Sequence, residues 1–206
     1  WFRAPSVAHW DYEVEGAYQF GQASTSTAAG AARVDVAAYF AHVLVGHTFA
    51  VPWQPRIGIA YDRASGDKRG SASNNRFDTL FGARRWEYGP TGIHGAVGRA
   101  NLSSLDGRIE LRPDARWETL VGYRALWLDA RSDSFASTGV RDATGDSGDF
   151  AGHQIETRVR FWLVPGRIRL EAGGAVLLTG RFLEDAPNAG GHGDTLYGYS
   201  MLSTTF

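Results

Sequence analysis

A two-residue alternation of apolar and polar side chains runs through most of this sequence and restricts it to β structure. Near residues 7–20 one face carries aromatic and aliphatic side chains, and the other carries acidic and polar ones. The first set is Trp10, Tyr12, Val14, Tyr18 and Phe20, and the second is His9, Asp11, Glu13, Glu15 and Gln19. Side chains of a strand point alternately to its two faces, so this pattern predicts a strand that is apolar on one face only.

The same pattern returns along the rest of the chain. It is clear near residues 56–62, 105–112, 117–129, 153–163 and 167–179, and loose near 195–206. Residues 36–49 also favour a strand, but both of its faces are apolar enough to leave the register open. Composition agrees, because 26 glycines and 13% aromatic residues accompany a single methionine and no cysteine. Apolar runs such as Ala172–Leu178 are far shorter than the roughly 20 residues of a membrane-spanning helix.

The connections between these strands alternate between two length classes. Three are short and contain proline, namely Ala50–Pro55, Arg112–Arg116 and Val164–Gly166. Four are long and polar, namely 21–33, 63–95, 130–150 and 180–194. Short turns on one side and long loops on the other are typical of outer-membrane barrels. We therefore predict an all-β, antiparallel up-and-down transmembrane β-barrel of about eight strands, surrounded by lipid in a bacterial outer membrane.

The orientation follows if the C-terminal Phe206 lies in the periplasm, because the short turns are then periplasmic and the long loops extracellular. Aromatic residues then form two belts, as amphipathic rings do at membrane interfaces. We place Trp10, Phe49, Trp53, Trp117, Phe161 and Phe206 in the periplasmic belt, and Phe20, Tyr61, Trp127 and Tyr197 in the outer belt. A terminal Phe206 preceded by alternating residues also resembles the signal read by the outer-membrane assembly machinery. The chain opens at Trp1 without a signal peptide, and we expect residues 1–206 to be the C-terminal portion of a single barrel domain.

The segment Arg76–Leu111, RFDTLFGARRWEYGPTGIHGAVGRANLSSLDGRIEL, resembles the alginate export porin family. In that family an FDxLF element is followed by a Tyr-Gly pair and then by an Arg-Asn-containing strand. The matching positions are Phe77, Asp78, Leu80, Phe81, Tyr88, Gly89, Arg99 and Asn101. The resemblance implies a monomeric eighteen-stranded barrel, of which this chain covers the C-terminal part, that passes an anionic polysaccharide outward.

A conduit for a polymer with one carboxylate per sugar needs cations spaced along its wall that attract the polymer without trapping it. Of 21 basic residues only Lys68 is a lysine, and arginine binds carboxylates through two parallel hydrogen bonds. Arg84 and Arg85 would be carried by a long loop folded into the pore. Alternation adds Arg99, Arg108, Arg124, Arg158, Arg160 and Arg169 as lumen-facing candidates. The alternative is that these arginines brace the wall by pairing with Glu110, Glu118, Glu156 and Glu171.

Other chemistry has little support in the sequence. The acidic stretch Asp142–Asp149, DATGDSGD, offers Asp142, Asp146 and Asp149 as weak Ca²⁺ ligands, but it lacks the closing glutamate of an EF-hand, and a solvated loop is the alternative. The six histidines have no metal-ligand spacing, so we expect no bound metal and no cofactor. A net charge of −1 argues against nucleic-acid binding.

Four functions are compatible with these observations. The first is an outer-membrane channel or exporter for an alginate-like anionic polysaccharide, and the second is a general porin for small solutes. A third is an outer-membrane barrel enzyme, although no motif requires one and we expect no catalysis. The fourth is a small closed anchor barrel, since eight strands leave room only for side chains.

Overall fold

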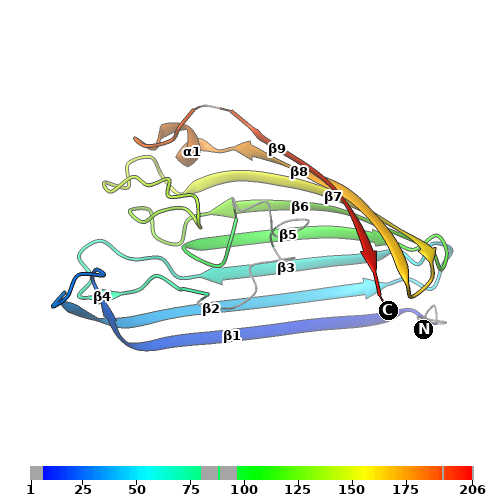
Figure 1. Ribbon diagram of the computed structural model, residues 1–206, viewed down its shortest axis with the longest axis horizontal. Helices are drawn as coiled ribbons and strands as arrows, with labels where there is room; N and C mark the ends of the chain where they lie inside the picture. Colours follow the sequence, from blue (N-terminus) through cyan, green and yellow to red (C-terminus); the bar gives the residue numbers. More distant parts are fainter. Residues whose placement is uncertain (1–6, 80–87, 89–96, 192, 206) are drawn as a thin grey trace.

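The computed structural model describes residues 7–79, 88, 97–191 and 193–205, and its strands form one nine-stranded sheet (Figure 1). The long strands are β1 (His9–Ser24), β2 (Arg33–Thr48), β3 (Arg56–Ala64), β5 (Leu102–Leu111), β6 (Trp117–Trp127), β7 (Phe150–Val164), β8 (Ile168–Thr179) and β9 (Thr195–Thr204). Each pairs antiparallel with the next, whereas the two-residue β4 (Ser73–Asn74) runs parallel to β2. The predicted all-β antiparallel fold is therefore confirmed.

Two predicted boundaries were wrong. β1 continues to Ser24 rather than ending near Phe20, because its last residues still pair with the start of β2. The connection after β3 runs to residue 101 rather than to 95, so Arg99 and Asn101 precede β5 instead of lying on a strand. The short helix α1 (Arg181–Asp185) follows β8. None of the described residues belongs to a helix that is long and apolar enough to cross a membrane.

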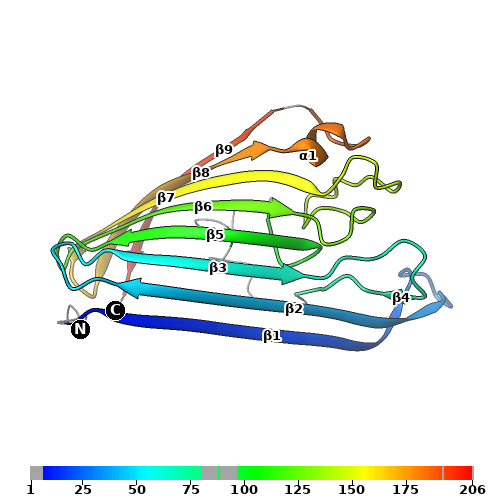
Figure 2. The same cartoon turned by 180° about the vertical axis from the view of Figure 1, so that it is seen from behind.

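The sheet is open and curled. Its two ends are β1 and β9, and β9 passes in front of β8 in Figure 1 but behind it in the opposite view of Figure 2. Among the described residues β1 and β9 do not pair with each other, so the sheet is not a closed eight-stranded anchor barrel. The long connections gather at one end of the strands and the short turns at the other (Figures 1 and 2). We call these the long-loop end and the short-turn end.

One face of the sheet, here called the apolar face, exposes large hydrophobic side chains on every long strand. Those more than half exposed on the strands are Trp10, Tyr12, Val14, Tyr18, Phe20, Ile59, Leu105, Val121, Leu196 and Leu202. The opposite face, here called the polar face, holds buried Asp62, Ser104, Arg124, Gln154 and Glu171. Such an apolar band on a sheet is stable only against lipid or another apolar surface.

The structure also sets the register of β2, which the sequence left open. His42 and Leu44 are buried on the polar face, while Val43 and Val45 are each 44% exposed on the apolar face. The neighbours decide this register, because Val43 pairs with Val14 of β1 and with Tyr61 of β3. Side chains that are paired in a ladder share a face.

Glycines on the polar face let long polar side chains lie flat on the sheet. A Cβ at Gly46 would lie 2.3 Å from the Arg56 guanidinium, and one at Gly122 would lie 3.0 Å from Glu156 Cγ. A Cβ at Gly173 would lie 2.8 Å from the Tyr199 ring. These glycines therefore determine how far the charged side chains stand out from the wall.

The aromatic belts agree with the sequence at most described positions. At the short-turn end Trp117 packs against Phe161 with ring centroids 4.5 Å apart and the rings tilted, and at the long-loop end Phe20 is 82% exposed on the apolar face. The placement of Tyr197 was wrong: it shares the polar face with Tyr199, with ring centroids 6.1 Å apart, while Leu196 takes the apolar face. Phe206 lies outside the described residues, so its part in barrel assembly stays a prediction.

We predict that Val121→Arg destabilises the full-length protein in bilayers by about 2–4 kcal/mol, because it places a charge on the apolar face midway along β6. The measurement is urea unfolding in lipid vesicles. Met201→Arg is the matched control, since Met201 pairs with Glu171 on the polar face and an added cation there meets a carboxylate. Equal destabilisation by both variants would contradict the assignment of the two faces.

Candidate functional site on the polar face

The described residues of the connection between β3 and β5 contact the polar face at three separate places. Its residue Phe77 packs on Phe40 of β2, with ring centroids 5.6 Å apart. Further along, Tyr88 lies against β6 and β7, and Arg99 then lies back over Phe40, its Cζ 4.1 Å from the ring centroid. With strands about 4.8 Å apart, the excursion from β2 to β6 spans roughly 15 Å.

The outgoing side of this connection is anchored by Phe77 and Asp78. The side-chain amide of Gln19, on β1, donates to the Asp78 carbonyl at 2.5 Å and accepts from the Asp78 N–H at 3.0 Å. Phe77 is 6% exposed in a small apolar cluster with Ala38, Phe40 and Ala64. A paired amide and a buried ring thus hold the FD element of the family motif on the sheet.

The far side is anchored by Tyr88, which is 5% exposed. The Tyr88 carbonyl accepts a hydrogen bond from Gln154 Nε2 at 2.8 Å, and the Arg124 guanidinium lies 5.0 Å from its ring centroid, within cation–π range. The returning side is held by Arg99, which donates two hydrogen bonds to Glu15 at 3.0 and 2.8 Å. Arg99 therefore braces a loop against β1, in the paired geometry of arginine and carboxylate.

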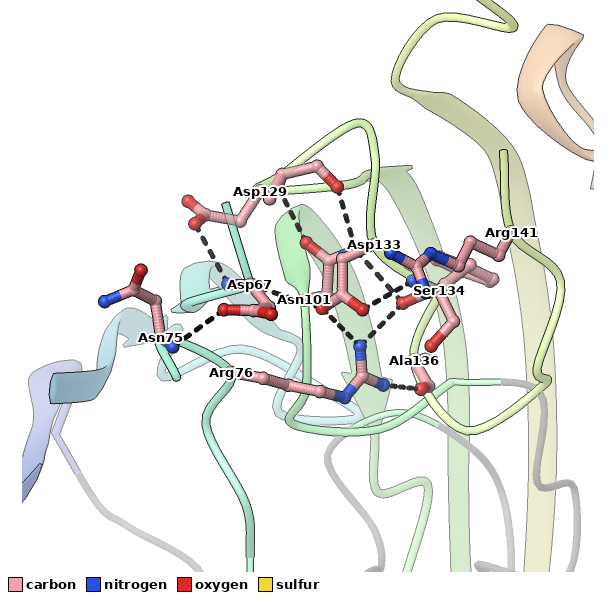
Figure 3. A network of polar contacts seen from close by, with 12 residues as sticks. Asp67, Asn75, Arg76, Asn101, Asp129, Asp133, Ser134, Ala136 and Arg141 are labelled. Atoms are coloured by element: carbon pink, nitrogen blue, oxygen red, sulfur yellow. Dashed lines mark hydrogen bonds and ion pairs between the residues drawn. The ribbon is translucent and has the colours of Figure 1, made fainter. Parts of the chain in front are cut away.

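Asn101 closes the connection at the long-loop end (Figure 3). It is fully buried and has a φ of 46°, a left-handed conformation that asparagine tolerates better than most residues. Its amide donates to the carbonyls of Ala130 and Ser134 at 3.1 and 3.0 Å and accepts from the Ala130 N–H at 2.7 Å. Gly66 is required beside it, because a Cβ there would lie 1.9 Å from Asn101 Oδ1.

Arg76 and Asp133 extend this network between the connection after β3 and the one after β6 (Figure 3). Arg76 donates to Asp133 Oδ2 at 2.6 Å and to the carbonyls of Ser134 and Ala136. Asp133 Oδ2 also accepts from the Asp67 N–H at 2.9 Å. The two connections are therefore joined by charge-assisted hydrogen bonds, which are the stronger kind in proteins.

We predict that Asn101→Ala loosens this network, because it leaves two carbonyls and one N–H without their partner, at about 1 kcal/mol each. Protection of the Ala130 amide against hydrogen exchange should fall about a hundredfold in the full-length protein. Asn188→Ala is the matched control, since Asn188 bonds Arg141 and Gly139 farther along the same connection and does not contact Ala130. Unchanged protection at Ala130 in Asn101→Ala would refute the anchoring role.

A buried ion network lies at the middle of the polar face. Asp62 accepts from His42 Nδ1 at 2.6 Å, from Arg124 at 3.0 Å and from the Ser104 hydroxyl at 3.2 Å. Arg124 reaches a second carboxylate, Asp106, at 3.2 Å. In a hydrolytic triad the imidazole bonds the serine, whereas here Asp62 stands between Ser104 and His42. The geometry braces four strands and does not activate a nucleophile.

The β7–β8 side of the polar face is rich in arginine. Arg160 Nε donates to Glu171 at 2.6 Å, and the Tyr199 hydroxyl donates to the same carboxylate at 2.7 Å. Arg169 lies farther from Glu171, at 3.6 Å. Arg158 forms no ion pair or hydrogen bond with another described residue. In this region cations outnumber the carboxylates that pair with them.

Exposure separates the two signs of charge here. The side chain of Glu171 is fully buried and that of Asp106 is 3% exposed, whereas those of Arg108 and Arg169 are 26% and 22% exposed. In these two pairs the carboxylate lies against the sheet with the guanidinium group above it, whereas Glu110 and Glu118 are 27% and 30% exposed. On the β1 side of the polar face the exposed charge is negative instead, because the side chains of Asp11 and Glu15 are 37% and 44% exposed.

The structure brings together most of the arginines that alternation placed on the polar face. Those found there are Arg108, Arg124, Arg158, Arg160 and Arg169, and Arg99 reaches it from the loop. Arg84 and Arg85, with the motif positions Leu80, Phe81 and Gly89, lie outside the described residues. Sequence reasoning missed Arg56, which binds Asp11 at 2.5 Å and Glu110 at 2.7 Å. The glycines facing it at positions 46 and 58 were the available signal.

The candidate calcium residues do not converge. Asp142 Oδ1 accepts from the N–H and hydroxyl of Thr144, and Oδ2 accepts from those of Ser147, at 2.6–2.9 Å. Asp149 instead pairs with Arg131 at 2.8 Å. Within residues 7–79, 88, 97–191 and 193–205, no three His, Cys, Asp or Glu side chains gather as a metal site would need.

Hydrogen bonds from Thr144 and Ser147 hold the pKa of Asp142 well below its ordinary value of 3.8. The pKa of Asp142 is lower in the folded protein than in the unfolded chain. The ionised carboxylate therefore stabilises the folded loop fully above pH 3.8, and this stabilisation is lost as the pH falls toward the folded pKa. We predict that the Thr144 and Ser147 amides stay protected from about pH 8 to 5 and lose protection below about pH 3. Asp142→Asn should lose protection at every pH and Asp146→Asn at none, as measured by hydrogen exchange corrected for intrinsic rates.

A curled antiparallel sheet with one lipid-compatible face, one charged face and loops of unequal length at its ends defines a transmembrane β-barrel of the porin class. The family model described as alginate export matches residues 2–195. The chain belongs to the alginate export family, whose members are outer-membrane porins and transporters rather than enzymes. A comparison with curated proteins gave no match.

Proposed function

We propose that this chain forms part of the wall of an outer-membrane conduit that passes an anionic, alginate-like polysaccharide without consuming energy. Lipid then surrounds the apolar face, and the polar face lines the lumen. The observation that carries the proposal is the layering of two pairs on β5 and β8, where the partly exposed guanidinium groups of Arg108 and Arg169 cover the buried carboxylates of Asp106 and Glu171. A polymer passing these two pairs meets the arginine first, and the carboxylate below partly neutralises it.

Partial neutralisation of the arginines suits transport of a polymer better than tight binding of it. A conduit must bind its cargo strongly enough to admit it and weakly enough to release it. Arg160 and Arg169 share Glu171, so their attraction for a passing carboxylate is reduced. Arg158 shares no carboxylate in this way, and the residue paired with it in β8 is Gly173, over which the Tyr199 ring lies. We therefore assign Arg158 as the strongest single contact on the described wall.

The connection between β3 and β5 supports selectivity through its described residues on the polar face. Phe77 and Arg99 lie on Phe40 of β2, and Tyr88 lies against β7. A cargo chain that follows the polar face must pass this obstacle, so the conduit favours an extended linear polymer. Arg84 and Arg85 belong to the same connection in sequence and remain our candidates for its charged lining.

We predict that Arg158→Gln in the full-length protein weakens current block by uronate oligomers about tenfold, since one charge-assisted contact to a carboxylate contributes about 1.5 kcal/mol. The measurement is single-channel conductance in planar bilayers with oligomer added. Arg131→Gln is the control, because Arg131 lies in a loop and pairs with Asp149. Equal block by wild type and Arg158→Gln contradicts the assignment, and equal block by neutral oligomers indicates a general porin.

A further inference from the structure

Arg63 is a charged side chain on the apolar face at the long-loop end. Arg63 is the penultimate residue of β3 and follows Ile57, Ile59 and Tyr61 on that face. Its side chain is 46% exposed. A charge on a lipid-facing surface is costly unless it reaches the headgroup level, which long arginine side chains can do. The position near the end of β3 meets this condition.

A buried carboxylate holds this arginine in place. Arg63 Nε donates to Asp129 Oδ1 at 2.6 Å, and the side chain of Asp129 is only 1% exposed. The second oxygen of Asp129 accepts from the Gly66 N–H at 3.2 Å, so both carboxylate oxygens are used. The guanidinium of Arg63 also lies over the Tyr39 ring, with Cζ 5.6 Å from the ring centroid, within cation–π range. Asp129 uses only Nε, so the Nη groups, beside Tyr39, can still donate to an external acceptor.

The strand pairing places the hydroxyl of Ser103 and the indole of Trp127 level with Arg63 along the strands. Arg63 pairs with Ser103 of β5, and Ser103 pairs with Trp127 of β6. Paired side chains on one face have Cβ atoms about 5 Å apart. The Ser103 hydroxyl forms no hydrogen bond with another described residue. Trp127 contacts Phe150 with ring centroids 5.8 Å apart, which continues the aromatic belt at this level.

We propose that Arg63 and Ser103 bind the phosphate group of an anionic lipid in the leaflet at the long-loop end. A guanidinium donates two parallel bonds to a phosphate, and an adjacent hydroxyl adds a third donor. The aromatic belt marks the depth at which lipid headgroups begin. The site faces away from the polar face, so a polymer inside the conduit does not reach it. The ligand is therefore a lipid and not the cargo.

The test uses the full-length protein in neutral phosphatidylcholine nanodiscs containing either diphosphorylated lipid A or its dephosphorylated form. Native mass spectrometry counts the lipid retained on release from the disc. Wild type should retain the phosphorylated lipid about tenfold better than the other, as one charge-assisted contact predicts. Arg63→Gln should lose this preference, and Ser103→Ala should reduce it several-fold while leaving the Arg63–Asp129 pair intact.

Arg181→Gln is the matched control and should keep the preference, because Arg181 is 71% exposed on α1 and pairs with Asp185. Retained preference in Arg63→Gln overturns the proposal. Unchanged lipid retention in Ser103→Ala also overturns it. This second variant keeps the test valid even if Arg63→Gln fails to fold. Competition by inorganic phosphate at the same concentration overturns the lipid assignment in favour of a free-anion site. No polymer is present, so the result is independent of the conduit proposal.

Discussion

The hydrogen-bonded ladder between neighbouring strands is the constraint on which the rest of this structure depends. In lipid no water is available to pair a strand's N–H and C=O groups, so each spanning strand must be paired on both sides. The pairing fixes the register, and the register decides which side chains share a face. Strand β2 illustrates this, because its own sequence is ambiguous and its neighbours place His42 on the polar face.

The same ladder explains how the polar face holds so many charges. A buried carboxylate needs a partner and further hydrogen bonds, and Asp62 obtains them from His42, Arg124 and Ser104 on three other strands. These partners occupy nearby rungs, so each ion pair also resists slippage of one strand past the next. Glycines such as Gly46 and Gly122 supply the space in which these side chains lie flat.

The sequence predicted the strands and faces well because period-two patterning is local. The charged face followed from the same pattern, and the described candidates on strands, from Arg108 to Arg169, lie on it, while their part in a substrate path stays a prediction. Pairing between side chains depends on register across strands, and the sequence could not show that Asp62 meets His42 and Arg124. Tyr197 was misplaced for a related reason, since the aromatic residues of β9 occupy its polar face. The position of Arg99 before β5 depended on Asn101, whose left-handed backbone ends the connection.

The family motif acquires a physical meaning from these contacts. Phe77 and Asp78 fix the connection to β1 and β2, Tyr88 fixes it to β6 and β7, and Arg99 returns it to β1. Each anchor uses a different interaction, namely ring packing, a backbone carbonyl and an ion pair. A single change in solvent conditions therefore does not release all of them. High salt weakens the exposed Arg99–Glu15 pair but barely affects Phe77 on Phe40. The described anchors of the connection therefore respond differently to the same change in conditions, which keeps part of it on the polar face when one of them weakens.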